Sequence, residues 1–299
     1  ILGLRFFGQG MLGHISMVFC GKWFFKNKGK AVAVANSGYT LAEAIMPTIF
    51  VALIGLLSWQ VSWYVSIIMS ILILASVRFL AKTERNKGTK PQKENQQVGM
   101  LKKSWKRSEM LRSWVFWAAV PGLMTSPMIT TTLFFHQVHL VEIKSWDLST
   151  YVLFIPAYSA ATLFSLYLIG YLVDKLSTKI ILPVFLFPLI SGLLLLSIAT
   201  SYLELLLIFI LLGLSAGAYI VVYGTFFPEF FGSLYLGSVR TVGVTIMVFS
   251  SAIGPVLSGY FIDSGYLIDH QFKFFAAFSV FASLLFLTIN LRVKLPENA

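Results

Sequence analysis

Charged residues are scarce in this chain, and cysteine is almost absent. Only 12% of its 299 residues are Asp, Glu, Lys or Arg, whereas soluble domains average about 25%. So few charges cannot coat the surface of a water-soluble globule of 33.4 kDa. The single cysteine, Cys20, excludes a disulfide framework and a cysteine-based metal cluster. The sequence offers no glycine-rich phosphate loop and no nucleophile with a matching base, so we predict no enzyme, no cofactor and no metal site.

Apolar residues, in contrast, are abundant, at 57% of the chain. The mean hydropathy is +0.81. Apolar runs of about 18 residues or more predict membrane helices. Nine such runs occur, at roughly residues 1–21, 31–57, 62–81, 113–138, 148–172, 178–199, 202–227, 241–262 and 272–291. The chain is therefore predicted to be an all-α membrane protein with nine transmembrane helices.

Residues 82–112 interrupt this pattern, because they are rich in Lys and Arg and contain Gly88, Pro91 and Gly99. This composition predicts a solvated linker, with room for an amphipathic turn around Trp105 on the membrane surface. It divides the chain into a partial N-terminal bundle of three helices (1–81), the linker (82–112) and a C-terminal six-helix bundle (113–299).

The basic residues lie on one side of the predicted helices. One set of alternate connections carries 20 of the 23 Lys and Arg residues, and the opposite set carries only Lys144 and Lys273. By the positive-inside rule, the linker and the C-terminus are cytoplasmic, in a multi-pass protein of the cytoplasmic (inner) membrane. Topology thus accounts for the net charge of +11, and we expect a lipid bilayer rather than nucleic acid around the protein.

A weak internal repeat relates two of the predicted helices. With a constant offset of 208, Gly29 aligns with Gly237, and the A-I-x-P of 44–47 aligns with that of 252–255. Helices one to three then correspond to helices seven to nine, and helices four to six lack a counterpart. We therefore expect a protein of two parallel six-helix halves whose first three helices are missing from this sequence. A natural nine-helix protein is the alternative.

Several short motifs resemble those of the major facilitator superfamily. Residues 4–10 (LRFFGQG) are similar to the R-x-x-G-x-G stretch of its fourth helix, and 23–31 (WFFKNKGKA) to the basic loop before its fifth. Residues 170–175 (GYLVDK) resemble its G-x-L-x-D-R gating loop, although Ser177 and Thr178 replace the usual Gly and Arg. Residues 228–240 resemble a loop of bacterial oxalate/formate and monocarboxylate-like carriers. The resemblance implies a major-facilitator-type bundle, with nine of twelve helices present.

This resemblance implies a secondary active transporter that works by alternating access. The expected substrate is a small organic anion (a carboxylate), moved by a monomer in exchange or together with protons. Two alternatives stay open. The aromatic content of 15% favours a transporter that exports drugs or other amphipathic molecules, and the missing helices favour a truncated fragment that does not transport.

Two charged residues inside predicted helices are candidates for coupling. Glu43 lies 13 residues after Lys30, about 20 Å along a helix and near the bilayer centre. A carboxylate at this depth must face the bundle interior, either as a proton carrier or as a structural group. Arg5, in the outer half of the first helix, could bind a substrate carboxylate, couple to Glu43, or stabilise helix packing.

Other candidates are polar groups at membrane depth or charges at helix ends. The fourth run contains Pro121 and Pro127, which predict an interrupted helix that lines a cavity. Asp174 and Arg240 lie at cytoplasmic helix ends, where they could close a gate or simply be solvated. Each of the other groups could serve helix packing instead. The candidate substrate-binding residues are Arg5, Tyr39, Thr125, Ser126, Thr130, Tyr158, Tyr219 and Tyr223, and the expected close-packing glycines are Gly213, Gly217 and Gly254.

Overall fold

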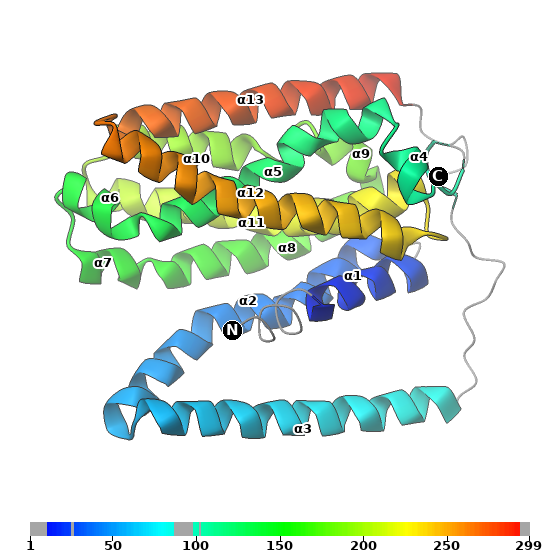
Figure 1. The fold of residues 1–299 in the computed structure, drawn as a ribbon, viewed down its shortest axis with the longest axis horizontal. Coiled ribbons are helices and arrows are strands. Elements are labelled where there is room, and N and C mark those ends of the chain that lie inside the picture. The colour runs from blue at the N-terminus through cyan, green and yellow to red at the C-terminus, as the bar shows by residue number, and fades with distance from the viewer. Residues whose placement is uncertain (1–10, 25–26, 87–97, 102, 294–299) are drawn as a thin grey trace. The chain divides into compact units, whose positions relative to one another are not determined.

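The computed structural model describes residues 11–24, 27–86, 98–101 and 103–293, and every regular element in these ranges is a helix (Figure 1). The all-helical fold class is confirmed. The helices are α1 (Leu12–Trp23), α2 (Lys28–Leu56), α3 (Trp59–Asn86), α4 (Arg107–Met110), α5 (Trp114–Phe135), α6 (Gln137–Ile143), α7 (Leu148–Leu153), α8 (Ile155–Leu176), α9 (Thr178–Ile181), α10 (Phe187–Ile198), α11 (Tyr202–Phe231), α12 (Leu236–Asp263) and α13 (Ile268–Arg292).

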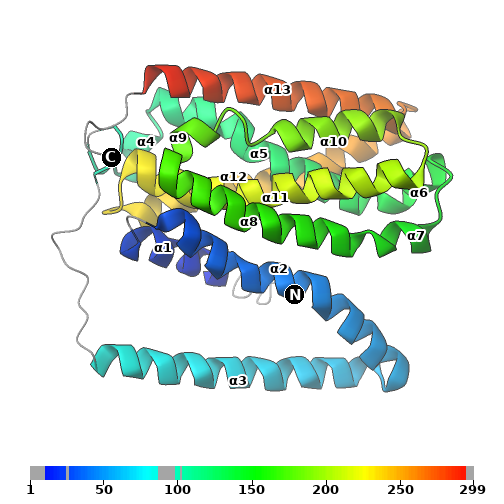
Figure 2. The same cartoon turned by 180° about the vertical axis from the view of Figure 1, so that it is seen from behind.

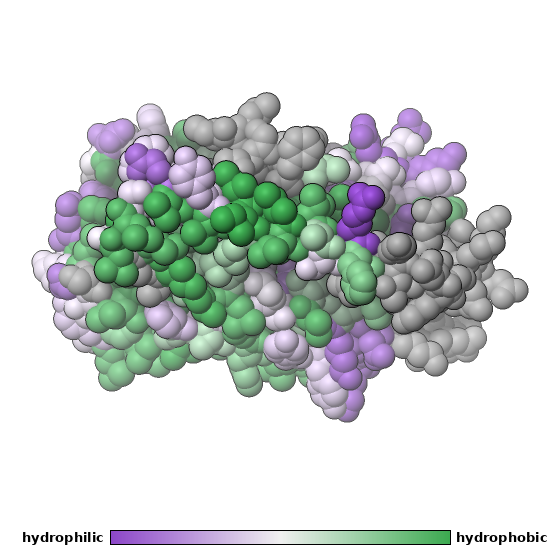
Figure 3. Space-filling model, turned by 90° about the horizontal axis from the view of Figure 1, so that it is seen from below, coloured by the Kyte–Doolittle hydropathy of each residue, from purple (hydrophilic) through white to green (hydrophobic). Residues whose placement is uncertain are grey.

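Six helices in the described ranges are long and apolar enough to cross a membrane. They are Trp59–Phe79, Trp114–Phe135, Thr150–Leu176, Tyr202–Phe231, Leu236–Asp263 and Ile268–Arg292. The predicted count of nine is not confirmed, although each predicted run contains a helix. Apolar side chains cover much of the face drawn in Figure 3, as expected for a surface in contact with lipid.

Contacts divide the chain into two units, residues 1–40 with 96–299, and residues 41–95. Helix α2 begins in the first unit and ends in the second. The second unit also holds α3, most of whose described side chains are exposed within the unit.

The first unit is a bundle of long helices (Figures 1 and 2). Helix α11 packs against α8 and α10, α5 packs against α12 and α13, and α10 packs against α13. Helix α1 contacts α11 and α12. The largest fully buried side chains include seven phenylalanines: Phe116, Phe226, Phe227, Phe230, Phe231, Phe272 and Phe286. Four of the seven lie near the end of α11, which places that end at the centre of the packing.

Small residues allow the helices to approach closely, as predicted for Gly213, Gly217 and Gly254. A Cβ atom at Gly213 or Gly217 would overlap the backbone of α8, and one at Gly254 would overlap the backbone of α5 at Met128. Association of helices in lipid depends on such close contacts, because no hydrophobic effect drives one helix onto another.

Prolines act differently in two segments, and both outcomes differ from expectation. Helix α5 continues through Pro121 and Pro127 instead of being interrupted. The predicted span 178–199, in contrast, is broken into α9 and α10 by turns over residues 182–186. Pro183 lies within those turns and Pro188 lies in the first turn of α10. Proline lacks the N–H that a continuing helix needs, so it is tolerated only at the beginning of a helix or where the freed carbonyl finds another donor.

The predicted linker 82–112 is partly helical. Helix α3 continues to Asn86, and α4 forms at Arg107–Met110. Met110 is fully buried, so the last part of this segment belongs to the bundle rather than to solvent.

Candidate functional site

The start of α2 is held by a carboxylate from another helix. Asp174, near the end of α8, accepts hydrogen bonds from the backbone N–H of Gly29 through Oδ1 (2.7 Å) and of Lys30 through Oδ2 (3.0 Å). The first N–H groups of a helix have no partner within the helix, and they carry a partial positive charge. Asp174 therefore both caps α2 and attracts it electrostatically, and it links two segments 145 residues apart.

Two glycines make this contact possible. A Cβ atom at Gly29 would overlap the carbonyl group of Gly170, and one at Gly170 would lie 2.8 Å from the carbonyl oxygen of Gly29. The two backbones therefore touch. Asp174 follows Gly170 by about one helical turn, which places its carboxylate over the first turn of α2.

A second carboxylate, Glu229 near the end of α11, binds the same turn. Its Oε1 forms an ion pair with Nζ of Lys28 at 2.9 Å, and the exposed fractions of the two side chains are 1% and 13%. Its Oε2 accepts a hydrogen bond from the backbone N–H of Thr178 at 2.9 Å. Loss of one partner from a buried ion pair typically costs about 3–5 kcal/mol, so the start of α2 is bound strongly to α11.

Part of the predicted linker covers the last turn of α11. In residues 98–101 and 103–106, here called the linker strap, the N–H of Met100 donates to the carbonyl of Glu229 (2.7 Å) and the N–H of Trp105 donates to that of Phe231 (2.9 Å). The carbonyls of a last helical turn lack partners within the helix, and the strap supplies them. The Trp105 ring packs edge-on against Phe231, with centroids 5.9 Å apart. Trp105 is therefore partly buried against the end of α11, and its predicted position at the membrane surface stays a prediction.

Glu109 fixes the end of the linker strap. Its Oε2 accepts from the backbone N–H of Lys106 (2.8 Å), and its Oε1 lies 3.1 Å from Nζ of Lys103. The N–H of Lys106, together with the ammonium group of Lys103, lowers the pKa of Glu109 below its ordinary value. The carboxylate is therefore ionised at neutral pH and holds the turn that begins α4.

Arg240 is buried rather than solvated, although it lies only one turn after the start of α12. Its exposed fraction is 4%. Its guanidinium carbon lies 5.4 Å from the centre of the Tyr223 ring, and its Nε and Nη1 have no hydrogen-bond partner. Among the described residues it forms no ion pair. Both Asp174 and Arg240 were predicted as gating residues; Asp174 binds α2, and Arg240 contacts α11.

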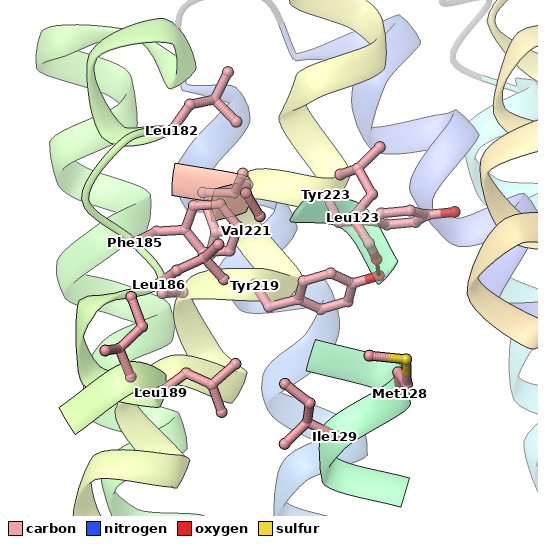
Figure 4. Close-up of a cluster of buried hydrophobic side chains, with 14 of the residues drawn as sticks. Leu123, Met128, Ile129, Leu182, Phe185, Leu186, Leu189, Tyr219, Val221 and Tyr223 are labelled. Atoms are coloured by element: carbon pink, nitrogen blue, oxygen red, sulfur yellow. Dashed lines mark hydrogen bonds between the residues drawn. The ribbon is translucent and has the colours of Figure 1, made fainter. Parts of the chain in front are cut away.

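Tyr219 connects α11 to α5 at the position where Pro127 disturbs α5. A proline leaves the carbonyl four residues earlier without its helical donor, which here is the carbonyl of Leu123. The hydroxyl of Tyr219 donates to this carbonyl at 3.0 Å, and Figure 4 shows Tyr219 reaching from α11 toward Leu123. This bond explains how α5 continues through Pro127, and it assigns the Tyr219 hydroxyl to helix packing.

The remaining candidates on α5 and α8 lie within the bundle but not in one cluster. Thr125 and Ser126 are buried, and the Thr125 hydroxyl donates to the carbonyl of Gly122 at 2.7 Å. Thr130 lines a small apolar pocket that has room for little more than one water molecule. Tyr158 is buried and meets Phe134 edge-on, with centroids 5.6 Å apart.

The candidates near the start of the chain are not buried in the bundle or lie outside the described residues. Tyr39 is 65% exposed, and Glu43 is also exposed. Arg5 lies outside the described residues. The structure therefore brings together Tyr219, Tyr223 and Arg240 within the first unit, whereas Glu43 lies in the second unit.

Lys28 and Glu229 were not predicted as site residues. A usable signal existed, because Glu229 is an acid at the end of the long apolar run that begins at residue 202. A carboxylate that continues so long an apolar run is expected to need a partner inside the bundle.

Comparison with known proteins identifies the family. Residues 2–190 match the Major Facilitator Superfamily. No curated protein matches the chain. The matched segment covers well over half of the 299 residues and includes α1, α2, α8 and Asp174. Together with its apolar helices, this match shows that the chain belongs to the Major Facilitator Superfamily of membrane transporters.

Proposed function

We propose that this protein is a secondary active transporter that carries a small organic anion across the cytoplasmic membrane by alternating access. The observation that carries the proposal is the attachment of one helix start, that of α2, to carboxylates from two other helices. These contacts join side chains to a helix end, so they can separate without the loss of any helix.

In this mechanism the contacts of Asp174 and Glu229 with α2 form the cytoplasmic gate. The helix ends concerned lie on the side that carries most of the Lys and Arg residues, which supports a cytoplasmic position. The gate is closed while both carboxylates hold α2, and it opens when α2 moves away from α8 and α11. Substrate binding can drive this change only if the substrate binds the two states with different affinity.

For coupling we keep the predicted residues, Glu43 and Arg5. Glu43→Gln retains the size of the side chain but cannot release a proton. In the full-length protein this variant should abolish proton-driven accumulation of substrate and leave exchange of substrate largely intact. Accumulation at the wild-type level would exclude Glu43 from coupling.

The native cysteine offers a direct test of the gate. Cys20 is the only cysteine of the chain, it is 5% exposed, and its thiol lies 3.7 Å from the carbonyl oxygen of Ala31 in the first turns of α2. Separation of α2 from α8 should expose this thiol to N-ethylmaleimide. Asp174→Asn should therefore raise the alkylation rate of Cys20 in membrane vesicles.

Asp263→Asn is the matched control, because Asp263 is an exposed carboxylate at the last residue of α12, far from the start of α12 that contains Arg240. It should leave the rate unchanged. Equal rates in wild-type protein and Asp174→Asn would contradict the proposed gate. Export of a cationic dye such as ethidium, without uptake of any carboxylate, would favour the drug-export alternative over an anion carrier.

A further inference from the structure

Arg240 presents a positive charge in the bundle, and no carboxylate among the described residues pairs with it. Among the residues that the structure describes, the groups that act on it electrostatically are Tyr223, Cys20, Tyr219 and His14, and none of these is a carboxylate. The half-buried cation at the start of α2, Lys28, is in contrast paired with Glu229. Lys28 therefore has a carboxylate partner, whereas Arg240 has none among the described residues.

An unpaired buried guanidinium is unfavourable. Arginine stays protonated, so it cannot reduce the cost of burial by losing its charge. A charge at membrane depth that lacks a partner typically marks a place where a ligand or ion binds. The nitrogens Nε and Nη1 are free to donate, and hydrogen bonds from a guanidinium to a carboxylate are among the strongest that proteins form.

The surroundings of Arg240 restrict the kind of anion. Tyr223 lies under the guanidinium, Tyr219 stacks on Tyr223 with centroids 5.5 Å apart, and Phe227 meets Tyr223 edge-on at 5.6 Å. The described residues place one unpaired positive charge among these rings. A single negative charge would neutralise it, whereas a second would itself be left buried and unpaired. The rings suit an apolar or aromatic body.

We propose that Arg240 and Tyr223 form a binding site for the carboxylate of a monocarboxylate with an apolar body. This inference rests on the proposed function, because it names the class of anion that the transporter carries. Tyr223 lies eight residues before the end of α11, about 12 Å along the helix. The site therefore lies inside the proposed gate, and Arg240 is a substrate-binding residue rather than part of the gate.

Equilibrium binding tests the site without requiring transport. The probe is benzoate, which has one carboxylate and one ring, and the comparison compound is benzamide, its neutral isostere. Benzoate should raise the Tm of the purified full-length protein in detergent, and benzamide should not. Arg240→Gln should weaken benzoate binding by about tenfold or more, as expected for loss of a charged hydrogen bond. Arg240→Lys should retain part of the affinity.

Two controls separate binding from a structural role. Arg292→Gln removes an exposed arginine in the last turn of α13 and should bind benzoate like wild-type protein. Without ligand, Arg240→Gln should be as stable as wild-type protein or more stable, because it removes an uncompensated charge. A lower Tm without ligand and unchanged benzoate affinity would overturn the proposal.

The choice of anion is tested in the same way. Stabilisation by inorganic phosphate instead of benzoate would also overturn the proposal. Benzoate binding and Cys20 alkylation are independent measurements. The alkylation result can therefore refute the gate without refuting the anion site, and the binding result can refute the anion site without refuting the gate.

Discussion

Removal of either charge of the Lys28–Glu229 pair should release the start of α2 from α11. Removal of both charges should release it less than Lys28→Met does. The two atoms lie 2.9 Å apart, and Glu229 is the more deeply buried partner, at 1% exposed against 13% for Lys28. Lys28→Met leaves a carboxylate buried without a cation, which costs about 3–5 kcal/mol for a fully buried pair. Glu229→Gln should cost less, because Lys28 can turn its ammonium group toward water.

Alkylation of Cys20 measures the opening. Each 1.4 kcal/mol changes an equilibrium about tenfold. We expect Lys28→Met to raise the alkylation rate by roughly 100-fold and Glu229→Gln by roughly tenfold, because the glutamine keeps an oxygen that can accept from Thr178. The double variant has no buried charge at this position, so its rate should fall below that of Lys28→Met.

Lys30→Met is the matched control, since Lys30 is exposed two residues further along α2. It should leave the rate close to that of wild-type protein. If the effects of the two single substitutions simply multiply in the double variant, the ion pair does not hold α2, and the reasoning is refuted.

Three other predictions follow from single contacts. Tyr219→Phe leaves the carbonyl of Leu123 without its donor and should destabilise the protein by roughly 1–2 kcal/mol, measured as a lower Tm in detergent. Glu109→Gln should speed hydrogen exchange in the linker strap at neutral pH. Because the folded-state pKa of Glu109 is lowered, the contribution of its charge is complete above the unfolded pKa, about 4.3, and the difference from wild type should vanish as the pH falls through the folded value. Gly217→Leu would overlap the backbone of α8 at Thr162 and should lower the yield of folded protein in size-exclusion chromatography, whereas Gly217→Ala should do so less.

The positions of the helices could be predicted because lipid imposes a simple rule on apolar run length. The rule fails at α9 and α10, where the run 178–199 is long enough for one helix. Pro183 breaks it, and hydropathy does not register that effect. Pro127 was expected to interrupt α5, but a hydroxyl from α11 binds the freed carbonyl. Whether a proline breaks a helix thus depends on a partner that lies 96 residues from the freed carbonyl of Leu123.

The site shows the same division between local and distant information. Asp174 could be identified from its motif, because the residues around it are contiguous in sequence. The burial of Arg240 could not be predicted in this way, because a side chain one turn into α12 could equally be exposed to solvent. The linker strap looked solvated because its composition is polar, yet its backbone N–H groups bind the end of α11. Backbone pairing of this kind leaves no trace in composition.

The most direct test of the account locks the proposed gate closed. The Lys30 ammonium lies 5.9 Å from the centre of the Tyr171 ring, beside the contact of Gly29 with Gly170, so Lys30→Cys with Tyr171→Cys in a Cys20→Ser background should form a disulfide between α2 and α8. The measurement is uptake of labelled benzoate into proteoliposomes before and after reduction. Alternating access predicts no uptake by the oxidised protein and recovery after dithiothreitol. Equal uptake by the oxidised and reduced forms, with the disulfide confirmed by mass spectrometry, would contradict it.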